Sequence, residues 1–393
     1  MAREVVIVGA ARTPIGAFQG SLSKLTAPQL GAIAIKAALE RAGVAPDQVS
    51  ETIMGCVLQA GVGQAPARQA AIFAGIPDSV PAVTLNKVCG SGLKAVIAGA
   101  QAIALGDAEV VVAGGMESMS NAPYLSPNMR GGARMGHVEF KDALIHDGLW
   151  DVYGNVHMGI CAEECSTSQG IPRSAQDEYA LESTRRAIAA QQAGLFTREI
   201  VPVTVTGGKG GDVVVSEDEG PKNAKVEKIP TLKSVFKKDG TVTAANSASI
   251  NDGAAALVLM SAERAKKEGR TVLGRITGHA GAARKPVEFT IAPTDAINAL
   301  LKRTGHKVGD VDLWEINEAF AAVTMAAMTE FELSHERVNV HGGACALGHP
   351  IGASGARIVV TLLGALRQYG FKKGVAALCI GGGEATAIAV ERL

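Results

Sequence analysis

The sequence is poor in aromatic residues and carries no net charge. Aromatic side chains make up 4% of its 393 residues, and 38 basic residues balance 38 acidic ones. Without an excess of positive charge, the chain lacks the electrostatic basis for nucleic acid or an anionic membrane as its main partner. No apolar run approaches the length of a membrane-spanning helix, so we expect no membrane partner. Hydrophobic residues nonetheless make up 47%, and 47 residues are glycine, a profile typical of a tightly packed α/β protein.

The cysteines follow no disulfide pattern, and the first residues show no targeting signal. The start of the chain leads directly into V-V-I-V, with neither the apolar core of a signal peptide nor an Arg/Ser-rich transit segment. We therefore expect a cytoplasmic protein with reduced thiols. The six cysteines are Cys56, Cys89, Cys161, Cys165, Cys345 and Cys379.

Two halves of the sequence repeat one order of patterns. In the first half, C-G-S-G at 89–92 precedes an apolar helical pattern and then E-V-V-V-A-G-G-M-E. In the second half, G-A-S-G at 352–355 precedes a similar helical pattern and then V-A-A-L-C-I-G-G-G-E. Strand-like runs alternate with helical ones throughout, which indicates parallel sheets covered by helices. We infer a duplicated α/β unit.

Composition divides the chain into two core domains and an insertion. Residues 1–119 form the predicted N-terminal core domain, which resumes at about 249–271. Residues 120–248 carry most of the turn signals and a charged stretch, which predicts an inserted loop or lid domain. Residues 272–393 form the predicted C-terminal core domain. A loop region of this length is usually functional in a compact enzyme.

Cys89 lies in a turn that precedes a predicted helix. A free cysteine is most often a small core residue. Here apolar residues recur at helical spacing from Leu93, so the helix begins near Ser91 and its dipole favours a thiolate at Cys89. Gly90 and Gly92 leave room for a close approach. We expect a nucleophile whose pKa lies below about 8.5, and it requires a base.

The loop at 341–355 offers a histidine that suits this task. His341, Cys345 and His349 are spaced as metal ligands on one helix face, but five glycines and a proline make this stretch an irregular loop, so we expect no metal. The glycine and proline on either side would instead fix His349 in a rigid turn. Imidazole is well suited to take a proton from a thiol near neutral pH. A structural core histidine is the alternative.

Two further motifs follow predicted strands. L-C-I-G-G-G-E places Cys379 at the end of a buried strand, where α/β folds locate their sites, and the glycines after it expose N–H groups suited to an oxyanion. W-E-I-N-E-A-F places Asn317 between a strand and a helix. A helix N-cap is the simpler interpretation of that asparagine.

Together these motifs resemble those of the thiolases. N-K-V-C-G-S-G, N-E-A-F, G-G-A-x-A-L-G-H-P-I-G-A-S-G-A-R and C-I-G-G-G occur in the family order, and V-H-M-G at 156–159 extends the match over essentially the whole chain. His157 and Met158 match an acetoacetyl-CoA thiolase pattern, so the chain is most similar to the acetyl-CoA acetyltransferases. The resemblance implies the thiolase fold, in which two duplicated βαβαβαββ core domains form a layered α/β/α/β/α sandwich with an inserted loop domain.

The resemblance implies a role for each of five residues in a reversible Claisen condensation of two acetyl-CoA to acetoacetyl-CoA and CoA. Cys89 attacks the thioester and carries the acetyl group. His349 takes its proton and later contributes to an oxyanion hole with Asn317, which acts through a water. Cys379 removes the α-proton of the second acetyl-CoA. Backbone N–H groups of Cys89 and Gly381 hold the other oxyanion.

The resemblance also implies a CoA-thioester site and a homo-oligomer. The partners are acetyl-CoA, acetoacetyl-CoA and CoA as substrates, with no separate cofactor and no metal. R-G-G-A-R-M-G resembles the segment through which thiolases form tetramers as dimers of dimers. The implied substrate-binding residues are Leu149, His157, Met158, Phe236, Ser247, Ser249, Phe289, Ala319 and Phe320.

Several positions depart from the family pattern. N-S-A-S at 246–249 places a serine on either side of the family's pantetheine-contacting serine. Six lysines between 222 and 238 stand where phosphate-facing groups are expected, or they form a solvated charged loop. Phe289 stands where short-chain bacterial enzymes often have methionine. The alternatives are a 3-ketoacyl-CoA thiolase of broader chain length and a non-catalytic acyl-CoA or lipid-binding protein on the same fold.

Overall fold

The computed structural model describes residues 3–208 and 211–393. The predicted domains 1–119 and 120–248 therefore each include two residues outside the described part. Within it, one mixed sheet of ten strands runs through the molecule, nine of them in a single path and β2 (Gly16–Ala17) paired with β12. The path is β14 (Leu313–Ile316), β15 (Lys373–Ile380), β16 (Glu384–Glu391), β13 (Gly274–Ala283), β1 (Val5–Arg12), β12 (Asn251–Ser261), β5 (Val110–Ser118), β3 (Glu51–Gly55) and β4 (Ala82–Leu85).

The sheet consists of two halves with the same topology. In the first, β3 lies parallel to both β4 and β5, and β5 and β1 lie antiparallel to β12. In the second, β14 is parallel to β15, which is antiparallel to β16, which is antiparallel to β13. A single bridge between Trp314 and Val338 occupies the place of β4. β1 and β13 pair antiparallel and join the halves into one sheet. The predicted duplication is confirmed. The expectation of parallel sheets is wrong, because β1, β12, β13 and β16 pair antiparallel with their neighbours and only β3, β4 and β14 have parallel partners alone.

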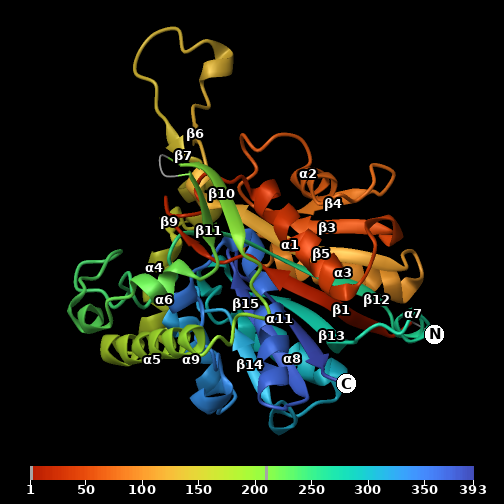
Figure 1. Cartoon of the computed structure of the whole chain (residues 1–393). Helices are drawn as coiled ribbons and strands as arrows, with labels where there is room; N and C mark the ends of the chain where they lie inside the picture. Colours follow the sequence, from red (N-terminus) through yellow and green to blue (C-terminus); the bar gives the residue numbers. More distant parts are fainter. Residues whose placement is uncertain (1–2, 209–210) are drawn as a thin grey trace.

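Helices occur at matching positions in the two halves and form the layers around the sheet (Figure 1). α1 and α2 pack together beside β1, β12 and β3, and α8 packs on β13 and β16. α3 and α11 occupy the centre, between the two half-sheets. α3 packs on β5 and β3 of the first half, and α11 packs on β5 and β12 of the first half and on β15 of the second. The helices are α1 (Ala27–Ala42), α2 (Pro66–Phe73), α3 (Ser91–Leu105), α8 (Ala292–Thr304), α9 (Ala321–Glu330) and α11 (Ile351–Gln368).

The central helices cross without side chains between them. A Cβ atom on Gly355 of α11 would lie 2.4 Å from the backbone nitrogen of Leu93 in α3, and one on Gly92 would lie 2.8 Å from the nitrogen of Ala356. Residues 88–105 are 18 residues long with a mean hydropathy of 1.5, enough to cross a membrane by length and composition. The expectation that no run approaches this length is therefore wrong. The apolar composition of α3 follows from its place in the middle layer, between the two halves of the sheet, where little of its surface faces water.

The segment between β5 and β12 adds small elements beside the sheet. A hairpin of β6 and β7 projects away from the body of the molecule (Figure 1). Arg12 of β1 connects the core to this segment, because its buried guanidinium binds both carboxylate oxygens of Asp218 (2.7 and 2.9 Å) and one of Glu199 (2.9 Å). The elements are β6 (Tyr124–Leu125), β7 (Lys141–Asp142), β8 (Trp150–Asp151), β9 (Val156–His157), α4 (Met158–Ser168), α5 (Arg173–Gln192), β10 (Val203–Gly208), β11 (Gly211–Val215) and α6 (Glu219–Asn223).

Candidate active site

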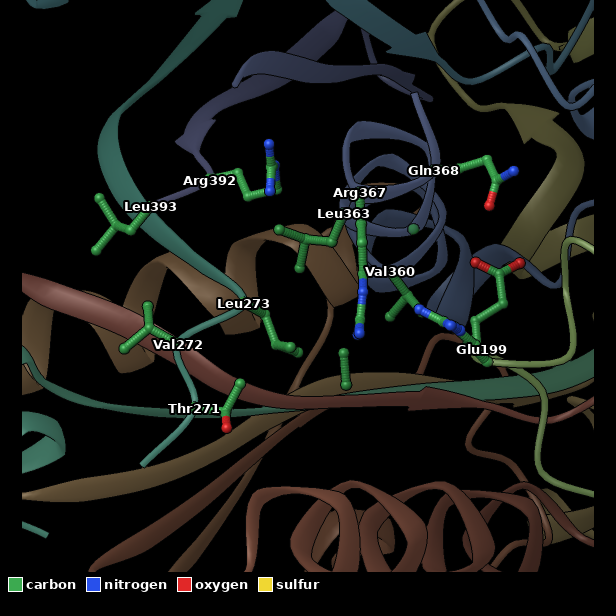
Figure 2. A pocket seen from close by; sticks show the side chains of 13 residues that line it. Glu199, Thr271, Val272, Leu273, Val360, Leu363, Arg367, Gln368, Arg392 and Leu393 are labelled. Atoms are coloured by element: carbon green, nitrogen blue, oxygen red, sulfur yellow. The ribbon is translucent and has the colours of Figure 1, made fainter. Parts of the chain in front are cut away.

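One cavity of about 600 Å³ collects most of the predicted site residues. Cys89, His349 and Gly381 line it, together with all nine residues predicted to bind substrate. These residues come from both core halves and from the inserted segment, so the cavity lies where the three parts meet. A second cavity of about 200 Å³ lies toward the other end of α11, around Leu363, Arg367 and Arg392 (Figure 2). Its lining contains no thiol or imidazole, so it is not the candidate site.

The turn after β4 holds Cys89 at the start of α3. Val88 adopts the left-handed conformation (φ 46°), which is rare for a β-branched residue and marks local strain. Ser91 stabilises this turn because its hydroxyl accepts from the backbone N–H of Lys87 (2.8 Å) and donates to the carbonyl of Val88 (2.6 Å). Cys89 is 9% exposed and faces the cavity.

The expectation that the pKa of Cys89 is lowered is wrong. Burial raises the pKa of the thiol to about 11, although the backbone N–H groups of Gly381 and of Cys89 itself lower it. Loss of hydration outweighs these donors, because a thiolate in a closed apolar setting loses its water shell. At neutral pH Cys89 is therefore a thiol, and it needs a base to become a nucleophile. The same two N–H groups can receive the oxyanion of a carbonyl bound to this sulfur.

His349 is held in a tight loop before α11. Gly348 has a φ of 104°, and a Cβ atom there would lie 2.3 Å from the side chain of Asn251. The Asn251 carboxamide oxygen accepts the backbone N–H of His349 (3.0 Å). The imidazole Nδ1 lies 2.6 Å from the Ser354 hydroxyl, which itself donates to the Pro350 carbonyl (2.9 Å). Ser354 therefore accepts from Nδ1–H, and the lone pair is on Nε2.

The environment of His349 keeps its ring neutral at rest and leaves one ring nitrogen available. Burial, and then the positive charge of Arg357, lower its pKa to about 3, so the ring is neutral at neutral pH. Nε2 is buried and has no hydrogen-bond partner among the residues that the structure describes. With Cys89 on the wall of the same cavity, Nε2 can take the thiol proton. His335 and His341 also have an unpartnered Nε2, so the position of His349 on the cavity wall distinguishes it from them.

Cys379 does not line the cavity, but it packs against residues that do, and it is close enough to Cys89 for a charge on one to affect the other. It is fully buried in an apolar cluster with Met158, Phe289 and Phe320. Its pKa is well above the usual thiol value because of burial and because a charge on Cys89 would repel a second one. The two sulfurs therefore cannot both be anionic. This coupling suits two groups that are charged at different stages of one reaction.

Asn317 does not line the cavity either, and it follows β14, the strand that pairs with the strand of Cys379. Its backbone N–H donates to the carbonyl of Ala377 (3.0 Å), two residues before Cys379. The side-chain Nδ2 is buried without a hydrogen-bond partner in the described part of the chain. The helix-cap interpretation is wrong, because α9 begins at Ala321 and its N-cap position is Phe320. Asn317 is thus a buried amide with a free donor.

Aromatic side chains form two walls of the cavity. The ring of His157 stacks on Phe236 with centroids 4.6 Å apart, and a Cβ atom on Gly159 would overlap the Phe236 ring. Phe289, 2% exposed, meets Phe320 edge to face at 6.2 Å. The cavity therefore combines a flat outer slot with a compact inner end.

The serines on either side of Ala248 line the cavity with their hydroxyl protons already engaged. Ser247 donates to the Thr243 carbonyl (2.6 Å), and Ser249 donates to the Asn251 side chain (2.8 Å). Each can still accept a hydrogen bond from a ligand. The departure from the family pattern thus removes a free donor from this wall.

Several cavity residues were not predicted from the sequence. Phe18, half-exposed on an early loop, carries no local signal that would connect it to this cavity. Ile351 stands inside the recognised G-H-P-I-G motif and could have been included. Within residues 3–208 and 211–393, no three His, Cys, Asp or Glu side chains converge as a metal site. The remaining unpredicted lining residues are Ala17, Met119, Gly148, Val235, Ala244, Ala248 and Ile250.

Comparison with known proteins identifies the family. The family described as "Thiolase, N-terminal domain" matches residues 5–263, and "Thiolase, C-terminal domain" matches residues 270–392. An "Acetyl-CoA acetyltransferase" of Cupriavidus necator is 55% identical over 390 residues, 99% of each chain. The human "Acetyl-CoA acetyltransferase, mitochondrial" is 51% identical, over 100% of this chain and 91% of its own. A crystal structure of the Bacillus anthracis acetyl-CoA acetyltransferase superposes with a TM-score of 0.97 at 42% identity, covering 100% of this chain and 99% of that one. This chain belongs to the thiolase family.

Proposed function

We propose that this protein is an acetyl-CoA C-acetyltransferase that condenses two acetyl-CoA to acetoacetyl-CoA and CoA, and also catalyses the reverse reaction. Full-length similarity to enzymes of that name supports the activity. The observation that carries it is a buried thiol and an imidazole with a free Nε2 on one cavity, together with a second buried thiol that packs against residues of the cavity wall. The CoA thioesters are substrates, and the reaction needs no separate cofactor.

The first half-reaction acetylates Cys89. His349 Nε2 takes the thiol proton, and the sulfur attacks the acetyl-CoA carbonyl, whose oxyanion the N–H groups of Cys89 and Gly381 stabilise. The C–S bond to CoA breaks, and CoA leaves as a thiol with the proton of Cys379. Acetylated Cys89 cannot carry the charge that would oppose a thiolate at Cys379, and the imidazolium of His349 offsets part of the cost of that buried thiolate.

The second half-reaction forms the carbon–carbon bond. The Cys379 thiolate removes an α-proton from the second acetyl-CoA, and the enolate oxygen is stabilised by His349 Nε2–H and by a water held by Asn317. The α-carbon attacks the acetyl carbonyl on Cys89, the C–S bond breaks, and the Cys89 thiolate recovers its proton from His349. Every proton that one step removes is returned by a later step.

Separate assays of the two half-reactions test these roles. Cys379→Ser should still form acetyl-Cys89, detected by mass spectrometry, but should not exchange the methyl protons of acetyl-CoA with D₂O. Cys89→Ala should lose the acetyl-enzyme. Equal loss of both partial reactions in Cys379→Ser would contradict the division of labour, and an unmodified Cys89 in the unaltered protein would favour a non-catalytic binder.

Chain-length preference separates the proposed activity from a broader thiolase. The compact inner end formed by Phe289 and Phe320 favours short acyl groups. We expect kcat/KM to fall steadily from acetoacetyl-CoA to a six-carbon 3-ketoacyl-CoA and longer substrates. A flat profile would indicate a 3-ketoacyl-CoA thiolase of broader range.

Three further proposals concern the CoA phosphates, the assembly of the protein and its location in the cell. Lys233, Lys237 and Lys238 are exposed on the segment whose Val235 and Phe236 line the cavity, so they suit the CoA phosphates. The projecting hairpin displays apolar side chains, including Met135 at 100% and Phe140 at 67% exposure, which supports a tetramer assembled through it as a dimer of dimers.

We assign the protein to the cytoplasm on its six free thiols.

A further inference from the structure

A buried arginine of α11 faces two polar side chains of β14 and the residue after it. Strand residues two apart point to the same face, so Glu315 and Asn317 are presented side by side to Arg357. Arg357 Nη2 donates to Asn317 Oδ1 (3.3 Å), and its Nη1 lies 3.6 Å from a carboxylate oxygen of Glu315. The side chains of Arg357 and Glu315 are each only 3% exposed.

This contact determines which end of the Asn317 amide is left free. A guanidinium has only donors, so it can bind the amide oxygen and never the amide nitrogen. With Oδ1 turned to Arg357, the donor Nδ2 points away from it, and Nδ2 is the buried atom without a partner among the described residues. Rotation of the amide by half a turn would place two donors against each other in a buried site, which is costly.

We propose that Arg357 is a positioning residue for the condensation step, and that it fixes Asn317 with its amide donor directed toward the substrate side. The inference rests on the proposed function, because it assigns Asn317 to the enolate oxygen. A lysine could not replace it, since one ammonium on a shorter stem cannot reach Glu315 and Asn317 with two separate nitrogens.

The bonding of Arg357 argues against a merely structural ion pair. Among the described residues, the guanidinium makes one hydrogen bond, to Asn317. Its Nε and Nη1 have no hydrogen-bond partner, and one carboxylate oxygen of Glu315 has none either. A buried ion pair that stabilised the fold would be expected to satisfy these atoms. The charge of Arg357 also helps to keep His349 neutral. The charge of Arg357 therefore disfavours the imidazolium, whereas its bond to Asn317 supports the condensation step, and a variant that keeps the charge separates the two effects.

The first experiment compares Arg357→Lys with the unaltered protein in both half-reactions. Lysine keeps the charge that acts on His349 but loses the bond to Asn317. We expect acetylation of Cys89 to stay within about threefold, whereas deuterium exchange into the methyl group of acetyl-CoA falls at least tenfold. Arg12→Lys is the matched control, because Arg12 is equally buried and ion-paired but contacts neither Asn317 nor His349. It should leave the ratio of exchange to acetylation unchanged. Equal loss of both half-reactions in Arg357→Lys would overturn the proposal.

The second experiment tests whether Arg357 acts through Asn317. Asn317→Ala should lower exchange, and adding Arg357→Lys to it should cause no further loss, because the group that Arg357 orients is gone. A multiplied loss in the double variant would refute the proposal. If Arg357→Lys does not fold, Glu315→Gln/Arg357→Met removes the guanidinium together with the carboxyl that faces it, whose pKa burial raises to about 8, and should show the same loss of exchange. Absence of exchange in the unaltered protein, or full exchange in Asn317→Ala, would instead refute the proposed function.

Discussion

Cys89 should become reactive toward alkylating agents only far above neutral pH. The perturbation is a pH series from 6 to 11 with iodoacetamide, which reacts with the thiolate and not with the thiol. Burial raises the pKa of Cys89 to about 11, against the lowering effect of the N–H groups of Gly381 and Cys89. The neutral imidazole of His349, whose pKa is lowered to about 3, supplies no compensating positive charge in the free enzyme. The resting pair is therefore a thiol and an imidazole.

The size of the effect follows from the two pKa values. At pH 7 a thiol of pKa 11 is about 0.01% ionised, whereas an ordinary thiol of pKa about 8.5 is about 3% ionised. Alkylation of Cys89 at pH 7 should therefore be roughly 300-fold slower than that of a model thiol, before any effect of limited access. Because each unit of pH multiplies the thiolate population tenfold below its pKa, the rate should rise about tenfold per unit up to pH 11.

The assay is mass spectrometry of the peptide that contains Cys89, with Cys89→Ala as the control for labelling elsewhere. Limited access scales the rate equally at every pH, so the slope of the profile reports the ionisation alone. His349→Ala should leave the slope unchanged, because a neutral imidazole does not stabilise the thiolate at rest. A plateau between pH 6 and 9 that disappears in His349→Ala would show a resting thiolate–imidazolium pair and refute this reasoning.

Two further predictions concern packing and substrate range. Gly355→Ala should destabilise the protein by about 1–3 kcal/mol, seen as a lower apparent Tm, because the new Cβ would lie 2.4 Å from the Leu93 backbone. Gly364→Ala on the same helix is the control, because its new Cβ would meet no atom closer than 3.5 Å, and it should be neutral or stabilising by up to about 1 kcal/mol. Equal Tm values for the two variants would contradict the close crossing of α3 and α11. If Phe289 leaves a niche for an α-methyl group, 2-methylacetoacetyl-CoA should be cleaved within about tenfold of acetoacetyl-CoA, a difference of about 1.4 kcal/mol. Phe289→Met should then change that ratio more than it changes acetoacetyl-CoA cleavage, whereas an unchanged ratio would leave Phe289 as packing only.

The positions of the site residues could be predicted because each follows a local signal. Cys89 precedes a helix that its own neighbours define, and His349 stands in the turn between a short helix, α10 (Ala344–Leu347), and α11. The expectation that the whole stretch 341–355 is an irregular loop is wrong, because its glycines and proline interrupt the helices only around His349. Cys379 ends a continuous apolar run, which is typical of a strand buried on both faces. The order of these signals in both halves also predicted the duplicated topology.

The electrostatic state of the site could not be read from the same signals. A helix N-terminus near Cys89 favours a thiolate, but the opposing loss of hydration depends on how completely distant segments cover the sulfur. Arg357 likewise stands in the middle of an apolar helical pattern, and its contact with Asn317 exists only because α11 packs against β14. Both effects arise from burial by residues remote in the sequence, which local patterns do not describe.

The duplication also shows what stands in the first half at the position of the second thiol. Gly115 of β5 and Ala377 of β15 hold equivalent places opposite the last residues of β3 and β14, so Glu117 is the counterpart of Cys379. The Glu117 carboxylate is fully buried and accepts backbone N–H groups from Val57 (3.0 Å), Leu58 (3.1 Å) and Gly352 (2.9 Å). These bonds hold the first turn of α11, three residues after His349. One copy of the position thus anchors the loop that carries the base, while the other supplies the second base itself.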